Sequence, residues 1–470
     1  MRNEKFNANS YLNNRNAPLG RDANGKAIRP PFRYNNYGFT IGGPIYFLNF
    51  GEHDPGDSVF TKYNKTYFFF SEEQRKDRRF PSLTSQVPNA NLRAGVFSFP
   101  ICLSGTISGT TRTCSQMLTA GSPLPSATIN PVSAAYLTNI FNKIPLPNFA
   151  PFQLIAPASG KADFQQEILK IDTAFTTKWS AYYRYQRDKI PTIDVNSLFS
   201  SGSGIPGVST SSTDSPGRTH TFQTTYVLSP NVIIEGRYTY AFGAILSSTI
   251  GLLAKANSSI NVPLPYASSD DRVPHLSISG LNGLVAFGPY NNFSNKSDYS
   301  SNVTWIFGSH TTKFGGSFSQ YRKNENALGG SNQGAFSAFN NTTSASPTQG
   351  LVCLTTVNNV PNTPSACPAG QQTTEQSFAN FLLGRNATFT QSKYDLTADF
   401  RQKNFQWFAQ DEFRVRRNLT LYYGVRYSFF GSPYDKNGLL SNFDPALYNR
   451  ANAPLVTGGG NRVEIGRAHV

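Results

Sequence analysis

The sequence predicts an all-β chain, a partial transmembrane antiparallel β-barrel of the outer-membrane type with long extracellular loops. Three observations support this. Long stretches alternate apolar and polar residues with a period of two, which is typical of a strand with two unlike faces. The apolar face of these stretches is rich in aromatic rings, whereas the opposite face carries charge. Connections of two or three residues alternate with very long ones, as in barrels with short periplasmic turns and long extracellular loops.

The clearest pattern lies between Arg401 and Pro433. In its second half, every other residue from Leu419 to Phe429 is apolar or aromatic, and the first half alternates in its own register from Phe405 to Val415. Only Arg417 and Asn418 separate the two halves, a gap that a tight antiparallel turn fills and a helical crossover cannot. Asp411 interrupts the apolar face, which an interface position in a membrane would tolerate.

The same alternation returns along the chain and predicts about twelve or thirteen strands. Phe6–Leu12 is a weaker candidate for a first strand, and the long stretch from Arg75 to Lys161 is expected to be a large surface loop that holds one helix, Ser133–Asn142. A brief strand at Gly334–Asn340 and a helix at Phe378–Leu383 are also expected. The main strands are expected at Phe32–Phe47, Lys65–Glu73, Asp163–Phe175, Trp179–Gln186, Phe222–Leu228, Val232–Phe242, Tyr299–Phe307 and Phe314–Phe318.

The composition is compatible with this fold. Hydrophobic residues make up 38% of the 470 residues and the mean hydropathy is −0.37. We find no run of about 20 apolar residues, which a membrane-spanning helix would need. Aromatic residues reach 13%, with 37 Phe and 23 Tyr. Aromatic girdles at both membrane interfaces would explain this content, although a Tyr-rich soluble β protein would show it as well.

The chain carries a formal charge of +15 and has a pI near 9.6. Binding to nucleic acid would require basic residues gathered on one face. The Lys and Arg residues are instead scattered among turns, loops and polar strand faces. We therefore expect no nucleic-acid partner, and favour attraction to anionic lipid head groups or to an anionic solute.

The four cysteines form two pairs that are close in sequence and lie in polar, Pro- and Ser-rich segments. Neither pair has CxxC spacing and no His lies nearby, so a metal site is disfavoured. Loop-closing disulfides in an oxidising compartment fit better, with reactive thiols as the alternative. The candidate disulfides are Cys102 with Cys114 and Cys353 with Cys367.

No motif for catalysis or for binding a cofactor is found. The five His residues are dispersed without ligand spacing, and Gly42-Gly43 lacks the Lys and the helix of a phosphate-binding loop. No GxSxG motif or acid, base and nucleophile set presents itself. We expect no cofactor, no metal and no enzymatic activity.

The charged residues on the polar strand faces are the candidates for a functional surface. They would line the lumen and contact a plug or a solute. Alternatively, they form a solvated wall with opposite charges paired across neighbouring strands, and this second interpretation is favoured for any single residue because exposed pairs contribute little. The candidate lumen-facing residues are Asp172, Arg184, Glu235, Arg237, Glu412, Arg414 and Arg426.

Several phrases in consistent order resemble the barrel region of TonB-dependent receptors, in particular the Oar-like group that carries a carboxypeptidase-regulatory-like domain. The phrases are FNANSYLNNR, NNYGFTIGGPI, KTYFFFSEEQR, LKIDTAFTTKWSAYYRYQ, GSHTTKFGGSFSQYR, FANFLLGR and WFAQDEFRVRRNLTLYYGVRYSFFGSP, followed by SNFDP. The resemblance implies a barrel of about 22 strands around a plug. It also implies uptake of a solute, here unidentified, when the inner-membrane TonB complex pulls, with outer-membrane lipid and the plug as further partners.

A non-transporting outer-membrane barrel for adhesion or surface organisation is the alternative. In either case we expect the bacterial outer membrane as location. Residues 1–445 are expected to form the partial barrel and residues 446–470 an irregular tail, in which residues 464–470, EIGRAHV, resemble a translated sequencing adapter. Because MRNEKFNANS lacks an apolar signal core and no strand is expected to close the barrel, we expect a piece of a longer protein with its plug upstream.

Overall fold

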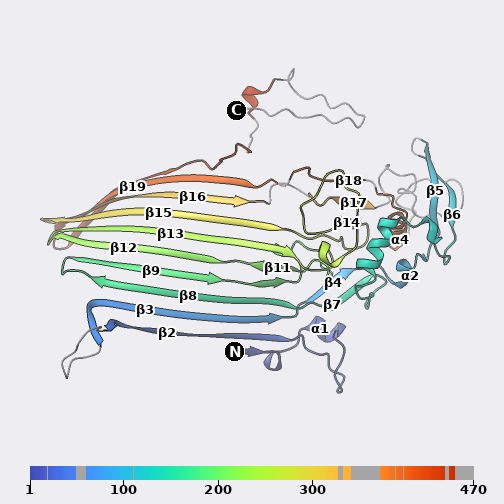
Figure 1. The fold of residues 1–470 in the computed structure, drawn as a ribbon, viewed down its shortest axis with the longest axis horizontal. Coiled ribbons are helices and arrows are strands. Elements are labelled where there is room, and N and C mark those ends of the chain that lie inside the picture. Colours follow the sequence, from blue (N-terminus) through green and yellow to red (C-terminus); the bar gives the residue numbers. More distant parts are fainter. Residues whose placement is uncertain are drawn as a thin grey trace.

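The structure is a computed structural model that describes residues 1–17, 19–48, 60–108, 111–326, 332–339, 371–386, 388–394, 396–439 and 444–449. Two parts can be distinguished in Figure 1, a long antiparallel sheet and a group of short strands and helices at one end of it. None of the helices in the described ranges is long and apolar enough to cross a bilayer.

A single 14-stranded sheet forms the larger part. Its long strands pair antiparallel in the order β2, β3, β8, β9, β12, β13, β15, β16, β19, β20, so that each neighbour in sequence is a neighbour in space. Short strands β1 (Arg2–Asn3) and β21 (Tyr434–Asp435) pair with β2 and β19. The long strands are β2 (Phe32–Leu48), β3 (Phe60–Arg79), β8 (Gly160–Ala174), β9 (Trp179–Lys189), β12 (Gly217–Ser229), β13 (Val232–Thr249), β15 (Tyr290–Phe307), β16 (His310–Glu325), β19 (Ala398–Arg416) and β20 (Leu419–Phe430).

Two of these strands are interrupted by proline and then continue. Pro191 separates β9 from β10 (Thr192–Asp194), and Pro216 separates β11 (Ser211–Asp214) from β12. The pairing register on each side of both breaks is the same. Proline lacks the N–H that a ladder needs, which explains the local breaks. The carbonyls of Pro191 and Pro216 still accept hydrogen bonds from Asp163 N and Ala244 N, at 3.1 and 3.0 Å.

The connections between long strands differ sharply at the two ends of the sheet. Residues 175–178, 230–231, 308–309 and 417–418 make short turns at one end, called here the turn end, at the left of Figure 1. Residues 80–159, 190–216, 250–289 and 326–397 connect strands at the other end, the loop end. The predicted alternation therefore extends through the last hairpin, where the sequence pattern left the parity undecided.

Aromatic and aliphatic residues occupy one face of the sheet across all the long strands. One cross-strand row runs Tyr238, Tyr299, Phe318, Phe405, Phe429. The Tyr238 and Tyr299 rings are 4.8 Å apart, and 55% of Phe429 is exposed. A water-soluble sandwich would cover such a row with a second layer, but Tyr238, Tyr299, Phe405 and Phe429 stay exposed and Phe318 is half-buried. We call this surface the aromatic face and the opposite one the polar face.

A compact cap covers the loop end. It contains β4 (Ser82–Gln86), α2 (Ala90–Arg93), the β5 (Ile101–Ser108) and β6 (Thr111–Leu118) hairpin, α3 (Pro131–Tyr136), the π-helical turn η3 (Leu137–Phe141), β7 (Gln153–Pro157), β14 (His275–Ile278), β17 (Ala335–Phe339), α4 (Gln371–Leu382) and β18 (Thr388–Thr390). The short 3-10 turns in the described ranges are η1 (Glu4–Phe6), η2 (Ser126–Thr128), η4 (Leu198–Ser200), η5 (Lys255–Asn257) and η7 (Pro445–Leu447).

The hydrophobic core of the described residues lies in this cap and not in the sheet. Tyr136, Phe141, Phe378 and Phe381 are each 1% exposed or less and pack edge to face around α3 and α4. Residues 80–159 therefore form part of a packed unit, which corrects the expectation of a surface loop. A segment of that length can bury apolar groups only with partners from the other loops, and α4 supplies them.

Polar contacts between distant segments hold the cap together. Glu375 on α4 accepts hydrogen bonds from the backbone N–H groups of Ser98 and Phe99, at 2.7 and 3.2 Å. Ser133 on α3 donates to the Phe381 carbonyl at 2.5 Å. Glu375 is only 1% exposed, and a buried carboxylate is stable in such a place only when backbone donors satisfy it.

The expectation of a first strand at residues 6–12 is wrong. Residues 6–12 do not pair in the sheet; Tyr11–Asn16 forms the helix α1, whose first turn is capped because Ser10 Oγ accepts from Asn13 N at 3.2 Å. Serine is a preferred cap, which overrides the weak alternation. The helix expected at 133–142, the helix at 378–383 and the brief strand at 334–340 are confirmed, as α3 with η3, α4 and β17.

Candidate functional site

The polar face brings all seven sequence-predicted residues onto one side of the sheet. The pairing register places each of them opposite to the aromatic rings of its own strand. Asp172 and Arg237, for example, belong to one row that runs Asp172, Tyr182, Gln223, Arg237. Whether this face encloses a lumen stays a prediction, because it depends on how the sheet closes.

Glu412 and Arg426 come together in a hollow of about 470 Å³ at the turn end. Lys313 lines the same hollow and lies 3.9 Å from the carboxylate of Glu235. The Arg426 guanidinium lies over the Phe408 ring, 4.8 Å from its centroid, an arrangement that holds the cation without a carboxylate. The residues that line this hollow therefore include two cations, Lys313 and Arg426, and two carboxylates, Asp411 and Glu412.

Asp172 lines a second hollow, of about 410 Å³, on β3, β8, β9 and β12. Its carboxylate is 2.6 Å from Lys170 Nζ, which also lies over the Tyr182 ring at 4.8 Å. Arg184 donates to Gln186 at 2.6 Å and does not line either hollow. Arg237 and Arg414 are on the polar face outside both hollows. The seven residues are thus distributed over the polar face of the 14-stranded sheet, called the wall below, and do not form one cluster.

The pocket at the loop end contains none of the residues that the sequence pattern indicated. This pocket of about 400 Å³ lies between β2, β3, β8 and β10 and is lined by Arg75, Asp77, Arg79 and Asp194. Asp77 is 6% exposed and its carboxylate is 2.7 Å from Arg79. A further hollow, of about 670 Å³, adjoins this pocket, and Arg79 and Pro81 line both. Two arginines that face a partly enclosed cavity can hold an anionic or carboxylate-bearing solute.

Burial raises the pKa of the Asp194 carboxyl, although the Thr213 hydroxyl donates to it at 3.3 Å. Asp194 lies on β10, beyond the aromatic rings at the loop end. Its carboxyl therefore holds its proton to a higher pH than an ordinary aspartate does. The Asp77 carboxylate offsets the charge of Arg79 in the same pocket.

The exception on the aromatic face, Asp411, is surrounded by donors from the two neighbouring strands, β16 and β20. His310 Nδ1 and Tyr423 Oη are each 2.7 Å from Oδ2, and Thr312 donates to Oδ1 at 2.9 Å. The His310 ring stacks on Phe413 with centroids 4.2 Å apart. His310 and Thr312 follow the turn at residues 308–309, and Thr312, Asp411 and Tyr423 lie directly opposite one another. That Asp411 lies at a membrane interface stays a prediction.

Cys102 is disulfide-bonded. The β5–β6 hairpin places Gly105 opposite Cys114 in the backbone register, but the Cys114 side chain lies outside the described part, so the pairing of Cys102 with Cys114 stays a prediction. Cys353 and Cys367 also lie outside the described residues. The connection that contains them begins and ends at the loop end.

A family model described as "Outer membrane beta barrel domain" matches residues 1–468. The chain belongs to this family. It is a β-barrel protein of the bacterial outer membrane, and the aromatic face is the surface that such a protein turns to lipid. No curated protein matches the sequence.

Similar solved structures include the outer membrane transporter YddB from Escherichia coli, with a TM-score of 0.46 and 7% identity over 92% of this chain and 39% of that one. The copper transporter OprC matches with a TM-score of 0.33 and 5% identity over 87% of this chain and 40% of that one. This family member thus spans about two fifths of the length of either transporter.

Proposed function

We propose that the chain is the barrel portion of a TonB-dependent outer-membrane receptor, with resemblance to the Oar-like group, that takes up an unidentified solute. The observation that carries this proposal is the two-faced wall. One face is aromatic and exposed, and the other is polar and leads from the hollow around Glu412 to the arginine-lined pocket at the loop end. The ordered sequence phrases support the family assignment independently.

In this proposal the loop-end pocket makes the first contact with the solute. Long loops are extracellular in such barrels, so a solute would meet Arg75 and Arg79 before it reaches the polar face. A plug and the inner-membrane TonB complex would be the partners that release it inward. Membrane insertion also requires partners for the outer edges of β2 and β20, because open edges do not persist in hydrocarbon.

The test begins with the complete gene and its full-length product. We expect it to encode a signal sequence and a plug upstream of this chain, and roughly ten further strands that close the wall. The purified full-length receptor should bind the purified periplasmic domain of TonB in a pull-down, and a variant without the TonB box should not. A complete gene without a plug, or equal capture of both forms, would contradict energised uptake.

The packed cap favours a second candidate, a non-transporting barrel for adhesion or surface organisation. A loop region with its own core, in which Phe378 and Leu382 are fully buried, is a stable platform for contacts outside the cell. If this second function is correct, cells that produce the protein with residues 80–159 deleted would lose adhesion to a surface or to other cells. The undeleted protein would also fail to bind the periplasmic domain of TonB.

A further inference from the structure

Three pairs of arginines lie directly opposite each other on neighbouring strands of the aromatic face, at the loop end. The pairs are Arg33 with Arg78, Arg187 with Arg218, and Arg322 with Arg401. Directly opposite residues have Cβ atoms about 4.5–5.5 Å apart, and like charges in that position destabilise a sheet. The sheet has this arrangement three times toward its loop end. The repetition suggests that an anion binds between the two arginines of each pair.

Protein carboxylates neutralise only one member of each pair. Arg78 pairs with Asp163, Arg187 with Glu167 at 3.5 Å, and Arg401 with Asp399. Within the described ranges, no carboxylate lies within ion-pair distance of Arg33, Arg218 or Arg322, and all three are exposed. Arg218 has only the Phe242 ring beneath it, at 4.8 Å. Each pair therefore presents one uncompensated positive charge to the outside.

The pairs lie on the loop-end side of the lipid-facing rings, and Arg322 and Arg401 are four residues from Phe318 and Phe405. The row of Arg187 and Arg218 is two residues from the row of Tyr185, His220 and Tyr240, which is a distance of roughly 7 Å. From Tyr240 to Val232 at the turn end the strand is roughly 27 Å long, so with the usual tilt the rings match the apolar band of a membrane barrel. Arg187 and Arg218 thus lie at the depth of the lipid head groups. Arg322 and Arg401 lie in the same cross-strand row, and the pair of Arg33 and Arg78 lies closer to the loop end.

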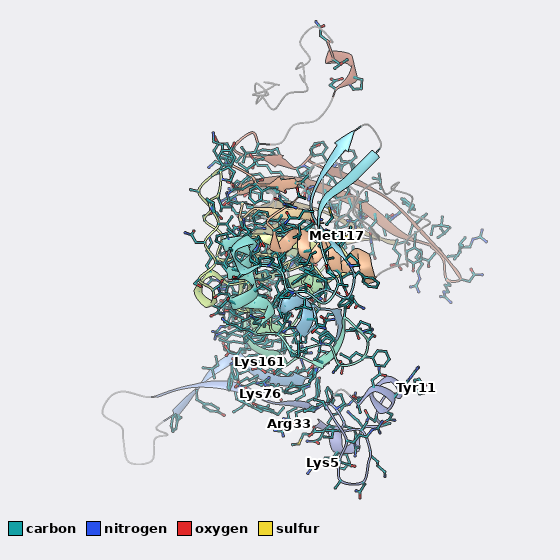
Figure 2. All side chains as sticks on the ribbon, turned by 90° about the vertical axis from the view of Figure 1, so that its right-hand side faces the viewer. Lys5, Tyr11, Arg33, Lys76, Met117 and Lys161 are labelled. Atoms are coloured by element: carbon teal, nitrogen blue, oxygen red, sulfur yellow. The ribbon has the colours of Figure 1, made fainter. Side chains whose placement is uncertain are left out.

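Among the residues that the structure describes at the turn-end rim of the aromatic face, no two arginines lie directly opposite each other. Trp179, Trp305 and Phe307 mark this rim, and Asp411 with its partner His310 provides the ionisable groups at the last two hairpins. At the loop end, by contrast, the basic surface extends along β2, β3 and β8, where Figure 2 shows Arg33, Lys76 and Lys161 next to one another. The two leaflets of the membrane therefore meet different surfaces.

We propose that the three arginine pairs bind the phosphate groups of an anionic glycolipid in the outward-facing leaflet. Two guanidinium groups on adjacent strands can donate several hydrogen bonds to one phosphate, which is the geometry that arginine favours. The ring-bearing surface directly below offers apolar contact to the acyl chains of the same molecule. The lipid would thus be held by its head group and by its tails at one position on the wall.

The experiment uses the full-length protein purified in dodecyl maltoside, with diphosphoryl lipid A as probe and native mass spectrometry as readout. The test variant combines Arg33→Gln, Arg218→Gln and Arg322→Gln, the three uncompensated arginines. The matched control combines Lys26→Gln, Lys143→Gln and Lys255→Gln, which removes the same charge from exposed loop-end positions. Heat-dependent migration on gels verifies that both variants are folded.

We expect the arginine variant to lose about tenfold or more of its lipid affinity, since charged hydrogen bonds at three sites are lost. The lysine variant should stay within about twofold of the unaltered protein, because distant surface charges contribute only screened attraction. Lipid A without phosphates should bind poorly to all forms. Equal loss in both variants, equal binding of dephosphorylated lipid A, or full competition by millimolar inorganic phosphate would each overturn the proposal.

Discussion

Asp411 illustrates how a single charged residue is accommodated on a surface that faces lipid. Only 11% of its side chain is exposed, and its two oxygens accept from groups on β16 and β20. The cost of a charge in this place depends on its depth and on its partners. Here the position toward the turn end reduces the cost that comes from depth. His310, Thr312 and Tyr423 reduce the remaining cost because they donate hydrogen bonds to the carboxylate.

Replacing Asp411 by alanine is therefore expected to destabilise the barrel. Three donors would be left without an acceptor beside the lipid. We expect the temperature at which the folded gel band disappears to fall by roughly 2–4 °C. Asp298→Ala is the matched control, because Asp298 has only an exposed pair with Lys296 at 3.0 Å. A larger effect of the control than of Asp411→Ala would contradict this explanation.

At the scale of elements, the cap depends on contacts between segments that are distant in sequence. β14 pairs in parallel with β17, and α4 packs against α3, β5, β14 and β17. His275 at the start of β14 accepts a hydrogen bond from Ala286 N at 3.2 Å, and burial, with a contribution from Arg272, lowers its pKa to about 4. Neutral His275 is thus part of the folded cap.

The low pKa of His275 predicts that the cap weakens in acid. The folded pKa lies below the unfolded value of about 6.5, so the unfolded state binds more protons as the pH falls. Its contribution, on the order of 3 kcal/mol, is present above pH 6.5 and is lost between about pH 6.5 and 4. Limited proteolysis of residues 250–289 should accelerate at pH 5. His275→Gln, which keeps an acceptor and does not titrate, should remove this part of the pH dependence.

Phe381→Ala tests the core of the cap separately from the sheet. Phe381 is 1% exposed and its ring lies within 5.4–6.4 Å of the rings of Phe378, Phe141, Phe339 and Tyr136. Its truncation should cost about 3–5 kcal/mol of cap stability. Proteolysis at residues 119–125 should rise strongly, whereas the gel migration of the barrel should stay unchanged. Loss of the folded barrel band would show that the stability of the sheet depends on the core of the cap.

The elements also show what sequence can and cannot predict. The strands were predictable because water and lipid impose a period of two on residues such as those from Leu419 to Phe429. The partners of Asp411 were not, because His310 and Tyr423 become its neighbours only through the pairing register. The cap was missed because its core joins residues more than two hundred positions apart, as in the contact of Ser133 with Phe381.

At the scale of the whole molecule, a membrane wall carries a packed cap at one end. The wall pairs each long strand with its neighbours in sequence, and the described strands β2 and β20 do not pair with each other. All the described short turns lie at the end opposite to the cap. From this polarity we predict the orientation in the membrane, with the cap outside the cell.

Cysteine labelling of intact cells tests that orientation. Ser122→Cys is in the cap and Ser309→Cys is in a turn of two residues at the other end. A membrane-impermeant maleimide should label the first and not the second, and both should react after the cells are opened. Labelling of only the Ser309→Cys variant in intact cells would reverse the orientation.

Because the core lies in the cap, the cap is suited to water and the wall is suited to lipid. The cap buries its own apolar groups, with Phe141 and Leu253 fully enclosed, and can keep its shape in water. The wall has no dry interior of its own and depends on amphiphiles for cohesion. A detergent that shields the rings poorly should therefore let the strands separate or stick together, while the globular end still resists digestion.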